Sequence, residues 1–76
     1  MKKVKITYCK LWNYKPKAVS LAEKIKNLLN IDSEILAGAK GIFDVEYPAG
    51  NLIFSKFKEF RFPNEEEVIE KINSIS

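Results

Sequence analysis

The hydrophobic period changes once within the first thirty residues, and this change constrains the fold more than any other feature. Apolar and polar side chains alternate over residues 4–8, which indicates a strand buried on one face. Over residues 18–29 the apolar side chains recur at helical spacing and form one stripe. Pro16 suits the first helical turn, and Asn30 suits the carboxyl-terminal cap. The chain therefore begins with a strand that leads into a helix over residues 15–29.

Three further strands are predicted in the middle of the chain. The first covers residues 33–37 and ends at Gly38. The alternation over residues 42–47 and the apolar run over residues 52–57 predict an antiparallel hairpin. Pro-Ala-Gly-Asn at residues 48–51 is a strong turn signal between them.

The last element is a helix with a recognisable start. Asn64 and Glu67 have the spacing of a capping box, and the three glutamates at residues 65–67 favour the positive end of the helix dipole. Its predicted apolar stripe consists of Val68, Ile69, Ile72 and Ile75. Strands joined by a helix pair in parallel, whereas hairpin strands pair antiparallel. We therefore predict a two-layer α/β domain over residues 1–76, with the element order β-α-β-β-β-α. It has a four-stranded mixed sheet and both helices on one face.

The chain contains one cysteine, Cys9, and no histidine among its 76 residues. An intramolecular disulfide cannot form, zinc sites built from cysteine and histidine lack their ligands, and nucleophile–histidine pairs lack their base. No metal site is therefore predicted. No apolar run reaches the length of a membrane span, and the first residues lack a signal-peptide pattern. We expect a cytoplasmic protein that does not bind membranes.

The charges are unevenly distributed. Residues 1–30 contain eight lysines and one glutamate, so this segment has a net charge of +7. A basic segment of this kind is compatible with nucleic-acid binding, but arginine is nearly lacking and no nucleic-acid motif is present. Solvated helix and strand surfaces explain the lysines, and we expect no nucleic-acid partner. Asp44 and Glu46 share one strand face, where we interpret them as solvent-facing residues.

Several short motifs occur in an informative order. Tyr-Cys at residues 8–9, followed by Asn-Tyr-Lys-Pro at 13–16, resembles the selenoprotein W-like redox family, which has a thioredoxin-like fold. The second half is similar to the same family through Gly-Ile-Phe-Asp-Val at 41–45, Gly-Asn-Leu-Ile-Phe-Ser-Lys at 50–56 and Arg-Phe-Pro at 61–63. Each motif is weak by itself, but together they cover nearly the whole chain. The resemblance implies a thioredoxin-like protein with thiol- or selenol-based redox chemistry.

The active motif of that family is Cys-x-x-Cys or Cys-x-x-selenocysteine, and this chain departs from it. Cys9 matches the first position, but the second position is Trp12, which cannot resolve a mixed disulfide. Three explanations are open. Trp12 replaces a natural selenocysteine, whose UGA codon differs from the tryptophan codon by one base. Alternatively, Trp12 is native and Cys9 acts alone as a monothiol. In the third explanation the redox chemistry is lost, and the fold serves as a binding module.

Cys9 has two interpretations. It follows a strand and precedes a helix amino terminus, and together with Lys10, Lys15 and Lys17 this position favours a thiolate. The alternative is a buried, inert cysteine, because free cysteine is among the most buried residue types. The strand pattern and the resemblance favour a reactive thiol. Such a thiol requires no cofactor, but it could hold glutathione as a mixed disulfide or be oxidised to a sulfenic acid. With selenocysteine at position 12, the selenolate would attack and Cys9 would resolve.

The loop around Cys9 is the predicted binding surface. Its candidate binding residues are Lys10, Leu11, Asn13 and Tyr14, with Gly38 and Gly41 from a glycine turn. Trp12, Tyr14, Phe60 and Phe62 are candidates for an aromatic ring around the loop; ordinary packing is the alternative, and it is favoured for Phe62. The resemblance implies that the glycine turn faces the motif, with an accessible cleft beside Cys9.

Two functions from different classes follow. The first is thiol-based redox chemistry at Cys9, with a small thiol or a protein as the partner. The second is a non-catalytic interaction module that uses the loop from Cys9 to Tyr14. An exposed strand edge is compatible with either a monomer or a weak dimer.

Overall fold

The structure is a computed structural model that describes residues 3–48 and 50–75. Its elements, in chain order, are β1 (Val4–Cys9), α1 (Lys15–Leu29), β2 (Ser33–Gly38), β3 (Phe43–Glu46), β4 (Leu52–Ser55), α2 (Lys56–Glu59) and α3 (Glu65–Ile75). Met1, Lys2, Ala49 and Ser76 lie outside the described residues. The structure therefore does not describe the ends of the predicted domain or Ala49 of the predicted turn.

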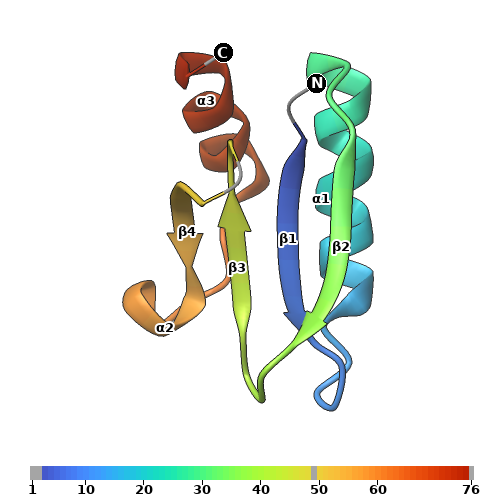
Figure 1. Ribbon diagram of the computed structural model, residues 1–76, viewed down its shortest axis with the longest axis vertical. Coiled ribbons are helices and arrows are strands. Elements are labelled where there is room, and N and C mark those ends of the chain that lie inside the picture. The colour runs from blue at the N-terminus through green and yellow to red at the C-terminus, as the bar shows by residue number, and fades with distance from the viewer. Residues whose placement is uncertain (1–2, 49, 76) are drawn as a thin grey trace.

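The four strands form one mixed sheet in the order β2–β1–β3–β4. β1 pairs in parallel with β2, and α1 connects the two strands (Figure 1). β3 pairs antiparallel with both β1 and β4. The α/β class and the mixed four-stranded sheet are thus confirmed. β1 is an interior strand, so its backbone is hydrogen-bonded on both sides.

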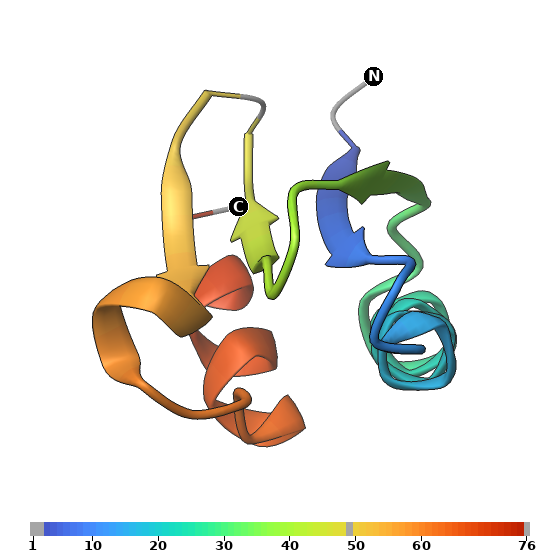
Figure 2. The same cartoon turned by 90° about the horizontal axis from the view of Figure 1, so that it is seen from below.

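The helices form a second layer on one face of the sheet, as predicted. Figure 2 shows α1 and α3 on the same side of the strands. The core between the two layers takes alternate residues from β1 and β3 and one stripe from each long helix. Its fully buried members include Val4, Ile6, Leu21, Ile25, Phe43, Val45, Val68 and Ile72. In the described part of the chain, no helix is long and apolar enough to cross a membrane.

The predicted helical stripes are wrong at their margins. Leu28 is 61% exposed and Ile75 is 41% exposed, although both were assigned to buried faces. On a helix with 3.6 residues per turn, Leu28 lies about 80° from Ala18, which is fully buried. Leu28 therefore lies at the edge of the stripe, and Ile75 is the last residue of its helix.

The predicted strand over residues 52–57 is wrong at its carboxyl end. β4 stops at Ser55, and the next four residues form the helical turn α2. Ser55 pairs with Asp44 near the start of β3, so a longer strand would have almost no partner. Phe57 and Phe60 are three residues apart, which is helical spacing, and short apolar runs do not separate the two structures by pattern alone.

The predicted hairpin turn is confirmed at the residues that the structure describes. The Tyr47 N–H donates to the Asn51 carbonyl at 2.9 Å, and the Asn51 N–H donates to the Pro48 carbonyl at 2.9 Å. The Tyr47–Pro48 peptide is cis. The pairing of β3 with β4 shifts register between Val45 and Glu46. β3 covers Phe43–Glu46, one residue less at each end than the predicted strand over residues 42–47.

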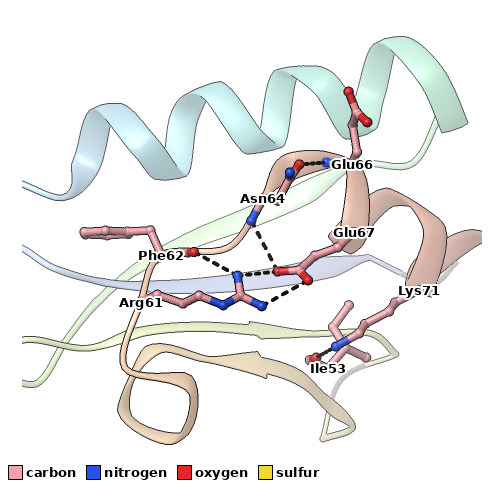
Figure 3. A network of polar contacts seen from close by, with 7 residues as sticks. All are labelled: Ile53, Arg61, Phe62, Asn64, Glu66, Glu67 and Lys71. Atoms are coloured by element: carbon pink, nitrogen blue, oxygen red, sulfur yellow. Dashed lines mark hydrogen bonds and ion pairs between the residues drawn. The ribbon is translucent and has the colours of Figure 1, made fainter.

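The capping box at the start of α3 is confirmed. The Asn64 side chain accepts the Glu66 N–H at 2.9 Å, and Glu67 accepts the Asn64 N–H at 3.3 Å (Figure 3). Arg61 adds a bidentate contact, with its two terminal nitrogens 2.7 and 3.1 Å from the Glu67 carboxylate oxygens. Further along the helix, Lys71 donates to the Ile53 carbonyl at 3.0 Å. These contacts attach α3 to the preceding loop and to the edge strand β4.

The Arg61–Glu67 pair predicts a pH-dependent contribution to stability. Hydrogen bonding by Arg61 holds the pKa of Glu67 below its ordinary value of 4.5. The ionised carboxylate therefore stabilises the fold at pH values above the unfolded pKa, and this contribution is lost as the pH falls through the lower folded pKa. We expect Glu67→Gln to lower the free energy of unfolding by about 0.5–1 kcal/mol at pH 7. The difference should shrink below a pH of about 4, as measured by urea denaturation.

The matched control is Glu70→Gln on the same helix, because Glu70 is exposed and forms no ion pair within the described residues. Its stability should stay close to that of the parent at both pH values. A Glu67→Gln deficit of the same size at pH 3 and pH 7 would contradict the ion-pair explanation.

Candidate functional site

The Cys9 loop, defined here as residues 9–14, connects the interior strand to the first helix. Its backbone folds back on the strand end, because the Tyr14 N–H donates to the Cys9 carbonyl at 3.2 Å. A tighter turn lies inside it, where the Asn13 N–H donates to the Lys10 carbonyl at 3.3 Å. Asn13 has a φ of 57°, a left-handed conformation that asparagine tolerates well. The loop therefore returns to Cys9 immediately before α1 begins.

The Cys9 sulfur accepts a hydrogen bond from the loop. The Trp12 backbone N–H lies 3.3 Å from the Cys9 Sγ. The donor belongs to the second position of the motif, and the interaction uses its backbone. It therefore does not depend on which side chain occupies position 12.

Cys9 is buried, and this corrects the expectation of an accessible cleft beside it. Its exposed fraction is 1%. The physical reason is that β1 has a partner on each side while the loop folds over its end. A cavity of about 320 Å³ lies elsewhere, between α1 and the segment leading into α3. Its lining includes Pro16, Lys17, Leu21, Phe43, Phe62 and Pro63, but not Cys9.

Trp12 lies across the glycine turn. Its side chain is 49% exposed, and a Cβ added to Gly41 would lie 3.0 Å from its ring. Gly41 has a φ of 78°, so the turn requires glycine there for its backbone conformation as well as for space. The Lys40 ammonium lies 5.8 Å from the centre of the Trp12 ring. The structure thus brings the glycine turn next to the motif, while the roles of these residues stay predictions.

Gly38 is required for close packing and not for a positive φ. It is the last residue of β2 and the register partner of Cys9, and it is not one of the glycines with a positive φ. An added Cβ would collide with the Thr7 side chain and lie 3.0 Å from Ile42. Gly38 therefore permits close packing at the strand end, whereas we had predicted a turn glycine.

A row of aromatic rings connects the loop to the core. Trp12 and Tyr14 make an edge contact with centroids 6.0 Å apart, and Tyr14 makes another with Phe62 at 4.6 Å. Phe62 in turn contacts the buried Phe43 at 5.4 Å. Phe62 is half-buried in this row, as the packing interpretation predicts. Phe60 does not join the row and is 89% exposed.

The lysines around the site differ from those expected. Lys10, Lys15 and Lys17 were predicted to favour a thiolate at Cys9. Of these three, Lys17 places its ammonium over the Phe62 ring, 4.6 Å from the ring centre. Two lysines that sequence analysis missed contact the aromatic row, namely Lys40 at Trp12 and Lys56, 5.7 Å from the Tyr14 ring centre. Lys56 was predicted to lie within the strand over residues 52–57, so its position beside the aromatic rings was not expected. The apolar pattern of this short segment does not distinguish its one-turn helix from a strand.

The remaining predicted binding residues lie on the surface of the loop. Lys10 and Asn13 are exposed, and Leu11 is 80% exposed. Within residues 3–48 and 50–75, no group of three or more histidine, cysteine, aspartate or glutamate side chains is arranged to hold a metal ion. The described site therefore consists of one buried thiol, backbone donors, aromatic rings and ammonium groups.

Comparison with protein families decides the relationship. Residues 3–74 match the Rdx family. The chain belongs to the Rdx family. Membership makes this Rdx chain a redox-type protein with the thioredoxin-like fold. A comparison with curated proteins found no matching relative.

Two solved structures share this Rdx fold. One is described as a selenoprotein W-related protein from Vibrio cholerae; it has a TM-score of 0.83 and 18% identity, and the match covers 96% of this chain and 94% of that one. The other is a protein from Bordetella parapertussis, with a TM-score of 0.89, 16% identity and coverage of 97% and 96%. At such low identity these likenesses show the fold alone.

The contact between the glycine turn and Trp12 predicts a specific effect of Gly41→Ala in this Rdx chain. An alanine at this φ costs about 1–2 kcal/mol of stability, and its Cβ pushes against the Trp12 ring. Because Trp12 is the only tryptophan, its fluorescence should shift as the ring is displaced.

The matched control is Gly50→Ala, where φ is 90° and no atom lies within 4 Å of the added Cβ. It should lose a similar amount of stability in denaturation experiments, with the tryptophan spectrum unchanged. Identical spectra for the two variants would contradict the placement of Trp12.

Proposed function

We propose that this protein carries out thiol–disulfide exchange at Cys9. The observation that carries the proposal is the hydrogen bond from the Trp12 N–H to the Cys9 Sγ at 3.3 Å. It occurs at the carboxyl end of β1 and immediately before α1, where a thiolate is favoured by backbone donors and by the helix dipole. Rdx family membership supports the same assignment.

The proposed reaction uses the thiolate form of Cys9 and a small disulfide such as glutathione disulfide. The Cys9 sulfur attacks one sulfur of that disulfide, a Cys9–glutathione bond forms, and the second glutathione leaves as a thiolate. A further external thiol then attacks the mixed disulfide, takes the glutathione as a new disulfide and restores the Cys9 thiolate. No metal or bound cofactor takes part. A chain whose single thiol must stay reduced suits a reducing compartment such as the cytoplasm.

The attack requires access to a buried sulfur. Cys9 is 1% exposed, so the Cys9 loop has to open before a disulfide reaches it. Two backbone donors, Trp12 and Tyr14, attach the loop to Cys9, and the Trp12 and Tyr14 rings pack on neighbouring groups, whereas Lys10, Leu11 and Asn13 are exposed. Opening of a short loop of this kind is a common gating step. Reactivity is therefore proposed to be limited by this opening.

The residue at position 12 determines which group resolves the mixed disulfide. With tryptophan there, an external thiol has to resolve the mixed disulfide, which describes a monothiol. If a selenocysteine occupied this position naturally, its selenolate would attack and Cys9 would resolve the intermediate. The backbone N–H contact with Cys9 persists in both cases, so the same loop suits either chemistry.

A second function is favoured by the exposure of the loop. Leu11 and Trp12 are 80% and 49% exposed and adjacent in the chain, and contiguous exposed apolar side chains are typical of an interaction surface. In this alternative the loop binds a protein and Cys9 remains a structural thiol. A monomer or a weak dimer suits both functions.

The deciding experiment follows the mass of the folded protein in a glutathione and glutathione disulfide buffer between pH 5 and pH 9. We expect the parent to gain one glutathione, and Cys9→Ser to gain none. We expect Trp12→Cys to form a reversible internal disulfide instead, because the second thiol can resolve the adduct. The adduct on the parent should form faster as the pH rises, since the thiolate is the attacking species.

Iodoacetamide provides the test against the second function. A parent that reacts with it only after unfolding, together with a Trp12→Cys variant that forms no internal disulfide while folded, would contradict the redox proposal. Circular dichroism of each variant, recorded first, verifies that it is folded.

A further inference from the structure

Four large apolar side chains are exposed around one end of the sheet. They form what is called here the apolar end patch, which consists of Leu11 (80% exposed), Trp12 (49%), Phe57 (53%) and Phe60 (89%). Figure 1 shows that the loop after β1, the turn between β2 and β3 and the short helix α2 lie at the same end of the molecule. The patch therefore combines segments that are far apart in the sequence.

The glycine turn brings the two halves of the patch together. A Cβ added to Gly41 would lie 3.0 Å from the Trp12 ring and 3.5 Å from the Phe57 ring. Both rings therefore pack over the same backbone position and are neighbours. Phe60 is the residue that ends α2, three positions after Phe57. The apolar surface thus continues from the Cys9 loop onto α2.

The conformation of Phe60 suggests that its side chain has a role outside the fold. Phe60 has a φ of 58°, a left-handed conformation that costs a non-glycine residue about 1–2 kcal/mol. At 89% exposure, its ring gains little burial to offset this cost. Glycine or asparagine would end the helical turn with less strain. Such strain concentrates at functional sites.

Positive charge surrounds the patch. Lys40 lies 5.8 Å from the Trp12 ring centre, and Lys56 lies 5.7 Å from the Tyr14 ring centre. Lys10 in the loop and Lys58 on α2 are exposed as well, and Glu59 is the acid within α2. An apolar surface with an ammonium rim is complementary to a segment that combines carboxylates with apolar side chains.

We propose that the apolar end patch docks an acidic segment of a protein partner. Apolar side chains of the segment pack on Trp12 and Phe57, and its carboxylates pair with Lys40 and Lys56. The inference deepens the proposed function and rests on it for one point, namely that the partner carries either a disulfide that the Cys9 thiolate attacks or a thiolate that attacks the Cys9–glutathione mixed disulfide and releases Cys9. A lipid surface or a nucleic acid offers no sulfur to this thiol, so a protein is the favoured occupant.

The test measures docking without any thiol chemistry. The probe is a short synthetic peptide of alternating glutamate and leucine, titrated into the ¹⁵N-labelled parent protein while a phosphine keeps Cys9 reduced. We expect amide shifts concentrated at the patch and the adjacent glycine turn, with a Kd below about 1 mM. Peptides with lysine in place of glutamate, or serine in place of leucine, should bind at least about fivefold more weakly.

Variants of the protein test the same contacts. Phe57→Ser and Lys40→Gln should each raise the Kd about fivefold. The matched controls are Leu28→Ser, an equally exposed apolar residue in the last turn of α1, and Lys3→Gln, next to the start of β1. Both controls should leave the Kd unchanged. Amide spectra with the dispersion of the parent verify that each variant is folded.

Several outcomes would overturn the proposal. These are shifts spread over the whole protein, equal binding of the lysine peptide, or no binding at millimolar peptide. Tighter binding to phosphatidylserine vesicles or to a single-stranded oligonucleotide than to the acidic peptide would assign the patch to a different class of partner. Because Cys9 stays reduced throughout, these results are independent of the glutathione experiment, which alone decides the redox function.

Discussion

The interior position of β1 is the constraint on which the rest of the structure depends. Its inward side chains, among them Ile6, are fully buried between two neighbouring strands and the helical layer. α1 lies in that layer and connects β1 to β2, so the two strands run parallel. The hairpin adds antiparallel strands on the other side of β1. Cys9 is the last residue of this strand and the register partner of Gly38 in β2. The fold thus fixes the thiol before any functional requirement is considered.

This placement has opposing consequences for the thiol. The loop that donates the Trp12 N–H to the sulfur is also part of the fold that buries it. Any reaction at this buried sulfur therefore requires a motion of the loop. The aromatic row from Trp12 through Tyr14 and Phe62 to Phe43 connects that loop to the core. Displacement of Trp12 therefore affects packing well beyond the loop.

The solved structures show that very different sequences adopt this fold. Identities of 16–18% accompany TM-scores of 0.83–0.89 over nearly the whole chain. An alternating strand pattern, two helical stripes and glycine at close contacts are physical requirements that many residue combinations satisfy. Chemistry is more demanding, because an exchange motif depends on the identity of single atoms. Similarity of fold therefore does not by itself determine the chemistry.

The sequence by itself determined the order of the four strands and the two long helices, the mixed sheet, the hairpin turn, the capping box of α3 and the position of Cys9 at a strand end, but not the short helix α2. These features depend on local periodicity and on residues with strong conformational preferences, such as Pro16, Gly41 and Asn64. Only the tertiary structure decided that Cys9 is buried, that β4 stops at Ser55 and that Lys40 and Lys56 contact aromatic rings. Each of these depends on a neighbour distant in the sequence. Burial, strand pairing and ring contacts are properties of pairs of segments, so a pattern within one segment cannot determine them.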